Sequence, residues 1–446
     1  MALIELDLYT PVEPATGPPP GRHRPLSVAL VAILVLVLSG SAPARSALWR
    51  RTGLAAIPGP QGTYALVGGQ LYTLVEDATR LVTTAWSLDP LRRLWDRVTP
   101  IPPQGRDGSM PGLGWSVRPA AAGDVLLQAD DGATVLDART GRARWSSPVP
   151  VDPLDGGRVG LVHDQQFRPG TRYDERLGAA GPLYFGTDGI FHTEPPVHTT
   201  LRALDLRTGR PLWNVTLDGP VVAATRPGDP GALLVVTSDR LAVLSVATGT
   251  VARERALTGM GRDQPEITAG LVLFRRGAGG PGAEVVAYST GSLAPVWRMS
   301  EGAYHGPAFC SELLCSAARF GMAVLDPATG RPRWRTQLGS SLVGRGDIVI
   351  ELGDAATRPV AVRDAVTGVV RIDLRGWTWS ADSRPEAPLV LGRVYGGQMI
   401  FGVLRPGGRS VHLLGVSSTP VANCASDERF VVCRVLGGVE VWSYLS

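Results

Sequence analysis

The chain has 446 residues, of which 44% are hydrophobic and 19% are charged, a globular composition with ample material for a core. All 44 basic residues are arginine, and the formal net charge is only +4. Because these arginines are scattered rather than clustered with aromatic residues, the composition argues against nucleic-acid binding. The absence of lysine indicates a GC-rich genome, and we expect an actinobacterial protein. Abundant Gly (55) and Pro (37) favour many turns between short strands.

The N-terminal part of the sequence predicts a tail followed by a membrane segment. Residues 1–24 are acidic and Pro-rich, and we expect a disordered tail there. Leu26–Leu38 is apolar except for Ser27, and uncharged sequence continues to Ala44. We therefore expect residues 25–44 to be a transmembrane signal-anchor. The alternative is a cleaved signal peptide, because Ala42-Pro43-Ala44 has the shape of a signal-peptidase site.

Internal repeats follow this segment and decide the fold class. Three segments align without gaps: TVLDARTGRARW, RALDLRTGRPLW and AVLDPATGRPRW. Each has a short apolar strand, an Asp, a Thr-Gly pair and a Trp eight residues after the Asp. The residues concerned are Asp137, Thr140, Gly141 and Trp145; Asp205, Thr208, Gly209 and Trp213; and Asp326, Thr329, Gly330 and Trp334. A fourth copy keeps Asp364, Thr367 and Gly368 but has Ile372 in place of Trp.

The motif has a direct physical interpretation. Asp and Thr side chains can bond to backbone groups of a tight turn, and Gly adopts the positive φ that other residues avoid. The motif therefore predicts a hairpin turn, with the Trp starting the next strand and packing between adjacent sheets. Degenerate copies lie at Ser87, Ser245 and Ser289, and most steps are near 40 residues, enough for four short strands.

Both ends of the repeat region predict a closed ring. Strands continue after Leu374 without the motif, and the segment around Trp49 resembles the outermost strand of a repeat that lacks its inner strands. We expect it to complete the last repeat, whose inner strands would lie near 420–446, so that no sheet edge stays free. Counting the segments that could form the third of the four strands gives up to nine candidate repeats. We predict eight repeats, with seven as the alternative.

One interval is longer than the others and carries the candidate metal ligands. The step from Asp137 to Asp205 is 68 residues, which predicts an insertion near 151–198. It contains His163, His192, Glu194 and His198, side chains that could bind a metal ion. The competing interpretation, which we favour, is that they are exposed loop residues, so the sequence assigns no metal site.

Four cysteines form two local pairs, Cys310 with Cys315 and Cys424 with Cys433. Both pairs lie in segments that resemble neighbouring strands, so we predict two cross-hairpin disulfides and an oxidising compartment. Free thiols or a zinc site are the alternatives.

The strand-Asp-x-x-Thr-Gly-x-x-x-Trp unit resembles the repeat of the pyrroloquinoline-quinone-like (PQQ-like) β-propellers. The resemblance runs from about residue 80 to 375. It implies an all-β fold: a single propeller of four-stranded antiparallel blades over residues 45–446, preceded by the transmembrane helix. The family includes quinoprotein alcohol dehydrogenases and BamB-type outer-membrane assembly factors, so it contains both enzymes and binding proteins.

The catalytic features of that family have no counterpart in this chain. Its enzymes carry adjacent cysteines at the quinone, Glu and Asn ligands for calcium, and an Asp base. Here no two cysteines are adjacent, and none of these residues can be carried over. Because the chain departs from the family's enzymes at these positions, we predict no catalytic residue and no cofactor.

The sequence as a whole predicts a monomeric, non-enzymatic module. We expect a single-pass protein of the cell membrane, with the propeller on the extracytoplasmic side binding envelope proteins or acting as a scaffold. The alternative is a sensor or oxidoreductase that binds a small ligand, quinone or metal in the central funnel.

Overall fold

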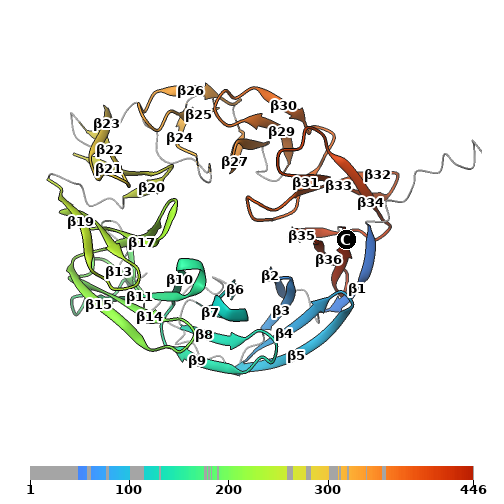
Figure 1. Ribbon diagram of the computed structural model, residues 1–446, viewed down its shortest axis with the longest axis horizontal. Coiled ribbons are helices and arrows are strands. Elements are labelled where there is room, and N and C mark those ends of the chain that lie inside the picture. Colours follow the sequence, from blue (N-terminus) through green and yellow to red (C-terminus); the bar gives the residue numbers. More distant parts are fainter. Residues whose placement is uncertain are drawn as a thin grey trace, which may run out of the picture. The chain divides into compact units, whose positions relative to one another are not determined.

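Most of the described residues lie in short strands joined by tight turns. The computed structural model describes residues 49–444 except 58–61, 77–79, 101–114, 130–131, 175–177, 179–180, 182, 188–189, 259–264, 278–282, 301–309, 311–312, 319–320, 338 and 354–357. In these residues, nine antiparallel sheets lie side by side in a ring (Figure 1). The ring is the predicted β-propeller.

The strands of each blade run in order from the innermost to the outermost. Blade 1 has β2 (Thr63–Val67), β3 (Gln70–Glu76), β4 (Arg80–Leu88) and β5 (Leu91–Pro100); blade 2 has β6 (Ser116–Pro119), β7 (Asp124–Ala129), β8 (Gly132–Asp137) and β9 (Ala143–Ser147); blade 3 has β10 (Asp152–Leu154), β11 (Val159–Gln166), β14 (His198–Asp205) and β15 (Pro211–Asp218). Blade 4 has β16 (Val222–Arg226), β17 (Asp229–Val236), β18 (Arg240–Ser245) and β19 (Val251–Ala256); blade 5 has β20 (Glu266–Thr268), β21 (Leu271–Arg276), β22 (Glu284–Ser289) and β23 (Pro295–Ser300).

The remaining blades complete the ring. Blade 6 has β24 (Cys315–Ala318), β25 (Gly321–Leu325) and β26 (Pro332–Arg335) among the described residues; blade 7 has β27 (Ser341–Arg345), β28 (Ile348–Leu352), β29 (Pro359–Asp364) and β30 (Val370–Asp373). Blade 8 has β31 (Trp379–Ser380), β32 (Leu389–Tyr395), β33 (Gln398–Leu404) and β34 (His412–Ser417); blade 9 has β35 (Ala422–Ser426), β36 (Phe430–Val435), β37 (Gly438–Ser443) and β1 (Arg50–Ala56). Short 3₁₀ turns span Ala121–Gly123 and Asp155–Gly157, and a hairpin of β12 (Tyr184–Phe185) and β13 (Phe191–His192) lies outside the blades.

The blade count corrects the sequence prediction. Eight blades were predicted and seven were the alternative, but the structure has nine. The error has a physical cause: blades 8 and 9 lack the Asp-Thr-Gly turn. The turn after β33 is built instead on Pro406, Gly407 and Gly408, and blade 9 takes its outer strand from the other end of the chain.

The ring closes as the segment around Trp49 predicted. Strand β1 pairs antiparallel with β37, from Arg50 opposite Ser443 to Ala56 opposite Gly438. Trp49 stacks on Trp442 at 5.7 Å between ring centroids, and its indole lies over Gly415 of blade 8. The first and last described strands are therefore hydrogen-bonded within one sheet.

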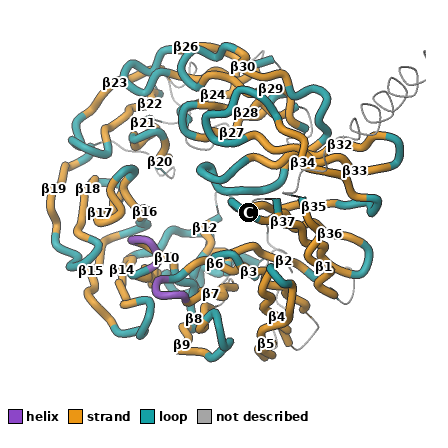
Figure 2. The backbone as a smooth tube through the Cα atoms, turned by 45° about the vertical axis from the view of Figure 1, so that its right-hand side comes forward, coloured by secondary structure: helices purple, strands orange, loops and turns teal. Residues whose placement is uncertain are grey.

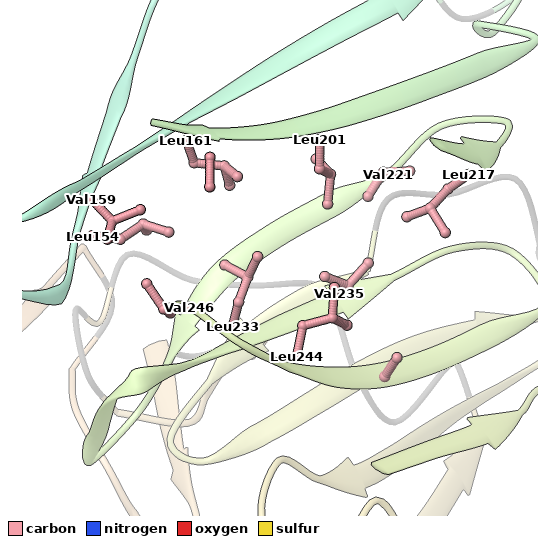
Figure 3. Close-up of a cluster of buried hydrophobic side chains, with 12 residues drawn as sticks. Leu154, Val159, Leu161, Leu201, Leu217, Val221, Leu233, Val235, Leu244 and Val246 are labelled. Atoms are coloured by element: carbon pink, nitrogen blue, oxygen red, sulfur yellow. The ribbon is translucent and has the colours of Figure 1, made fainter. Parts of the chain in front are cut away.

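Apolar side chains fill the spaces between neighbouring blades. Figure 3 shows the cluster between blades 3 and 4, where Leu161 and Leu201 of one sheet face Leu233 and Leu244 of the next. Leu201 and Leu233 are fully buried. Alternate residues of each strand point to the two faces of its sheet, so both faces of every blade must be apolar in a ring.

The repeat motif joins each blade to the next one. The indole nitrogen of Trp145 donates to the carbonyl oxygen of Leu206 at 2.7 Å, and that of Trp213 donates to Val246 at 2.8 Å. The same indole packs over the motif glycine of the following turn, Gly209 for Trp145 and Gly249 for Trp213. The predicted packing of Trp between sheets is thus confirmed.

The predicted anchor at 25–44 and the tail at 1–24 lie outside the described residues. Among the described residues, no helix is long and apolar enough to cross a membrane.

Candidate functional site

Two faces of the ring can be distinguished from strand register. In the blades that have the motif, it lies where the third strand ends, and the third strands of all nine blades end on the same side of the ring, which we call the motif face. The loops between second and third strands lie on the other side, which we call the opposite face. The insertion of blade 3 joins β11 to β14, a second and a third strand, and therefore belongs to the opposite face (Figure 2).

The insertion proper is residues 167–197. The earlier part of the predicted interval, from 151 on, forms the ordinary inner strands β10 and β11 of blade 3. In the hairpin, Tyr184 pairs with His192 and Phe185 pairs with Phe191. Since side chains alternate along a strand, these two pairs point to opposite sides of the hairpin.

The inward side of the hairpin is held by packing and hydrogen bonds. His192 is 4% exposed and stacks flat on Phe167, with ring centroids 3.7 Å apart. Its Nδ1 lies 3.1 Å from the hydroxyl of Thr171. Backbone bonds from Tyr173 to Phe191 and from Thr193 to Thr171 add a further segment to β13. Strand β13 is therefore supported by hydrogen bonds along one edge and by packing of His192 on its buried side.

The outward side leaves large apolar groups in solvent. Leu183, Phe185 and Phe191, which we call the aromatic patch, are 36%, 45% and 38% exposed. The two phenylalanine rings contact each other with centroids 5.0 Å apart. Next to the hairpin, Arg168 and Glu194 neutralise each other at 3.1 Å. Exposed apolar groups on a supported scaffold are typical of a protein-binding surface.

The candidate metal ligands do not come together. His163 lies in β11, and burial lowers the pKa of its imidazole. Glu194 pairs with Arg168, and the Nδ1 of His198 lies 2.9 Å from Asp218. Among the described residues, no group of three His, Cys, Asp or Glu side chains is arranged to hold a metal ion.

A second candidate site is a cavity of about 720 Å³ on the inner side of blades 9 and 1. It is lined by the β2 strand and its turn, by the segment after β31 and by the turn after β35. Charged groups converge on it, namely Asp382, Arg384, Asp427, Glu428 and Arg429. No sequence motif marked these charged residues, because they come from two separate segments, 382–384 and 427–429.

Backbone pairing fixes the shape of this cavity. The amide of Asp382 donates to Cys424 at 2.8 Å and the amide of Ser426 donates to Asp382 at 2.8 Å, so the segment pairs with the inner strand of blade 9. Buried Arg345 holds the same segment through the hydroxyl of Ser383 at 2.6 Å, and burial lowers the pKa of this guanidinium.

The wall of the cavity presents polar groups to a ligand. The hydroxyl of Ser426 is buried at its wall and has no hydrogen-bond partner among the described residues. Burial raises the pKa of Asp427, whose carboxylate accepts the amides of Arg429 and Phe430. The lining contains no histidine or cysteine.

Both predicted disulfides are present. Cys424 and Cys433 face each other across β35 and β36 with sulfurs 2.03 Å apart, as predicted for a hairpin. Cys310 and Cys315 are also bonded, at 2.10 Å. That second bridge does not cross a hairpin: β24 begins at Cys315, and Cys310 lies in the turn before it.

Comparison with known proteins gives a family match and remote structural likenesses. The family profile described as outer membrane protein assembly factor BamB matches residues 197–370 and 281–398. BamB from Moraxella catarrhalis is 18% identical, with 74% of this chain and 96% of that chain covered and a TM-score of 0.34. The computationally designed Ika8 protein is 14% identical, with 87% and 99% covered and a TM-score of 0.39. A eukaryotic initiation factor is 11% identical, with 81% and 90% covered and a TM-score of 0.45. No curated protein matches the sequence.

Proposed function

We propose that this chain, a member of the PQQ-like β-propeller family, is a membrane-tethered, non-enzymatic binding module whose aromatic patch docks a partner protein of the cell envelope. The observation that carries the proposal is the patch itself. An insertion that stacks buried His192 on Phe167 and leaves Phe185 and Phe191 in solvent favours contact with another apolar surface.

The position of the patch agrees with a tether. Arg50 pairs with Ser443 at the end of a third strand, so the chain enters the ring on the motif face. The aromatic patch lies on the opposite face. A ring tethered through its N-terminal segment would thus turn the patch away from the membrane, where a partner can reach it.

Affinity capture with paired variants tests this function. The tagged full chain is expressed in cells that make it naturally, cross-linked and recovered under denaturing conditions. We expect F185S/F191S to lose the partner that wild type captures. The control V366S/V369S removes two valines that are 60% and 63% exposed in the motif turn of blade 7, and it should capture as wild type does. Equal capture by both variants would refute the patch as the docking surface.

A small polar ligand in the cavity is the second candidate. The unpartnered hydroxyl of Ser426 and the converging charges favour it. Mass spectrometry of the purified full chain under native and denaturing conditions tests it. An added mass that is lost on denaturation, and reduced in S426A, would establish this second function. A bare chain mass under both conditions would argue against it.

A further inference from the structure

The motif face carries exposed arginines that neither candidate site uses. In blades 1–3 they are Arg92 at the start of β5, Arg139 and Arg142 in the turn of blade 2, and Arg207 and Arg210 in that of blade 3. We call this set the basic arc. Its members belong to three consecutive blades, whose outer strands β5, β9 and β15 follow one another along the rim (Figure 1).

The acidic residues of these turns are already occupied. The carboxylate of Asp137 accepts the amide and hydroxyl of Thr140 and pairs with Arg144 at 2.9 Å. The carboxylate of Asp205 accepts the amide and hydroxyl of Thr208, each at 2.7 Å. The segments 88–93, 137–144 and 205–210 contain seven arginines and three aspartates, an excess of four positive charges. No arginine of the basic arc forms an ion pair with any described acidic residue.

The excess charge differs from blade to blade: the turn of blade 8 also carries exposed Arg405 and Arg409 without an acidic residue, and that of blade 6 carries exposed Arg331 while Arg333 pairs with Asp326. The equivalent segments of blades 4 and 5, residues 245–250 and 289–294, contain no charged residue. In blade 7, Arg371 is paired with Asp364 and Asp347. The motif turn needs only Asp, Thr and Gly, so its fold does not require the additional arginines of blades 1–3.

The basic arc also adjoins the point where the chain enters the ring. Strand β1, the outer strand of blade 9, begins at Arg50 on the motif face, and blade 9 is the neighbour of blade 1. Trp49, which precedes this strand, therefore lies toward the face that carries the arc. Under the proposed tether, a membrane attached on the N-terminal side of Trp49 would face the arginines.

We propose that the basic arc binds the anionic headgroups of a lipid bilayer and orients the ring with its motif face toward the membrane. The orientation rests on the proposed tether, whereas binding of lipid by the arc does not. The arginines are spread along an exposed rim rather than gathered in a pocket, an arrangement that fits an extended charged surface better than a single small anion. The proposal leaves the aromatic patch free for its protein partner.

Vesicle co-sedimentation of the full chain tests the arc. The probes are vesicles of phosphatidylcholine alone and vesicles of phosphatidylcholine with phosphatidylglycerol at roughly 70:30, which have a negatively charged surface. The test variant is R142Q/R207Q/R210Q. The control variant is R255Q/R335Q/R358Q, which removes three exposed arginines toward the opposite face.

We expect wild type and the control variant to bind the anionic vesicles at least about tenfold more tightly than the test variant, since each basic residue near an anionic surface contributes measurably. The difference should vanish at about 1 M salt, where the Debye length falls to about 3 Å. Unchanged unfolding midpoints show that all variants are folded.

The outcomes separate the arc from the tether. Equal binding of all variants to neutral vesicles would come from the N-terminal segment rather than from the arc. A lack of binding to neutral vesicles would count against the tether but not against the arc. Equal binding of the test and control variants to anionic vesicles would overturn the lipid proposal. Poly-glutamate serves as a second probe. If the test variant loses binding to poly-glutamate but keeps its binding to the anionic vesicles, the lipid proposal is also overturned, because the arc would then recognise an acidic polypeptide.

Discussion

At the scale of the residue, the motif glycine has two separate tasks. Gly209 has a φ of +71°, and a Cβ at this position would lie 2.8 Å from the indole of Trp145. Gly228 has a φ of +79° but has nothing within 4 Å of a Cβ. The two glycines share the backbone requirement, while only Gly209 lies under a tryptophan.

This contrast gives the first prediction. We expect Gly228→Ala to cost about 1 kcal/mol through its left-handed backbone, and Gly209→Ala to cost about 2–4 kcal/mol because the indole must also move. Urea unfolding of both variants measures the difference. Equal costs would show that the tryptophan does not rest on the glycine.

A second residue-scale prediction concerns pH. Burial lowers the pKa of His163 below its ordinary 6.5, so the folded state binds fewer protons than the unfolded state as the pH falls through and below that value. His163 then lowers stability progressively below about pH 6.5 and has no such effect above it. We expect H163Q to lose less in melting temperature than wild type between pH 7.5 and pH 5.5.

H412Q is the matched control, because it removes a histidine that is exposed to solvent. Its melting temperature should follow that of wild type across the same interval. If H163Q and wild type have the same pH dependence, the histidine is not buried in the neutral form.

At the scale of the element, two motif positions are substituted together where blades 4 and 5 meet. Leu293 occupies the position of the motif glycine in blade 5, with a φ of +58° and its amide bonded to Ser289. Its side chain is 1% exposed and fills space between the two blades. Arg253 stands where blade 4 should have its Trp, and it donates to the carbonyl of Gly291. The leucine therefore replaces the indole.

A double-mutant cycle tests this exchange. Arg253→Trp should destabilise the ring because its indole meets Leu293, and Leu293→Gly should destabilise it by leaving a cavity. The double variant restores the arrangement of the other blades, so we expect a favourable coupling of about 1–3 kcal/mol between the two sites. Additive effects in urea unfolding would show that the two positions do not share one space.

The motif residues were predictable from the sequence, whereas the residues that replace them were not. Asp, Thr, Gly and Trp stand out because a turn and an interblade contact need those residue types at fixed spacing. In the sequence, Leu293 and Arg253 stand only as departures from the motif. Each compensates for the other across the space between two blades, and no spacing along the chain indicates that relation. The phenylalanines at 185 and 191 had no signal beyond their place in a long interval.

At the scale of the whole molecule, closure depends on strand β1. Trp49 contacts Trp442 within blade 9 and Phe401 of blade 8, at 5.7 and 4.7 Å between centroids. We expect Trp49→Ala to lower the free energy of unfolding by about 3 kcal/mol, as much as Trp334→Ala at an ordinary interblade contact. A negligible loss for Trp49→Ala alone would mean that the ring is closed without β1.

The ring and its closure were predictable from sequence, but the blade count and the cavity were not. Blades 8 and 9 form by strand pairing and packing around Phe401 and Trp442 without the turn motif that makes the others recognisable. The cavity joins residues 64–69, 382–387 and 425–430, which only ring closure brings together.

The most direct test of the account is the position of the partner on the ring. A photoreactive phenylalanine analogue is placed at Phe191 on the opposite face, at Val369 on the motif face or at Glu428 beside the cavity, and the full chain is irradiated in its native cells. If the aromatic patch is the docking surface, a cross-linked protein forms from position 191 and none forms from position 369 or 428. Cross-links from 369 or 428 with none from 191 would contradict the account.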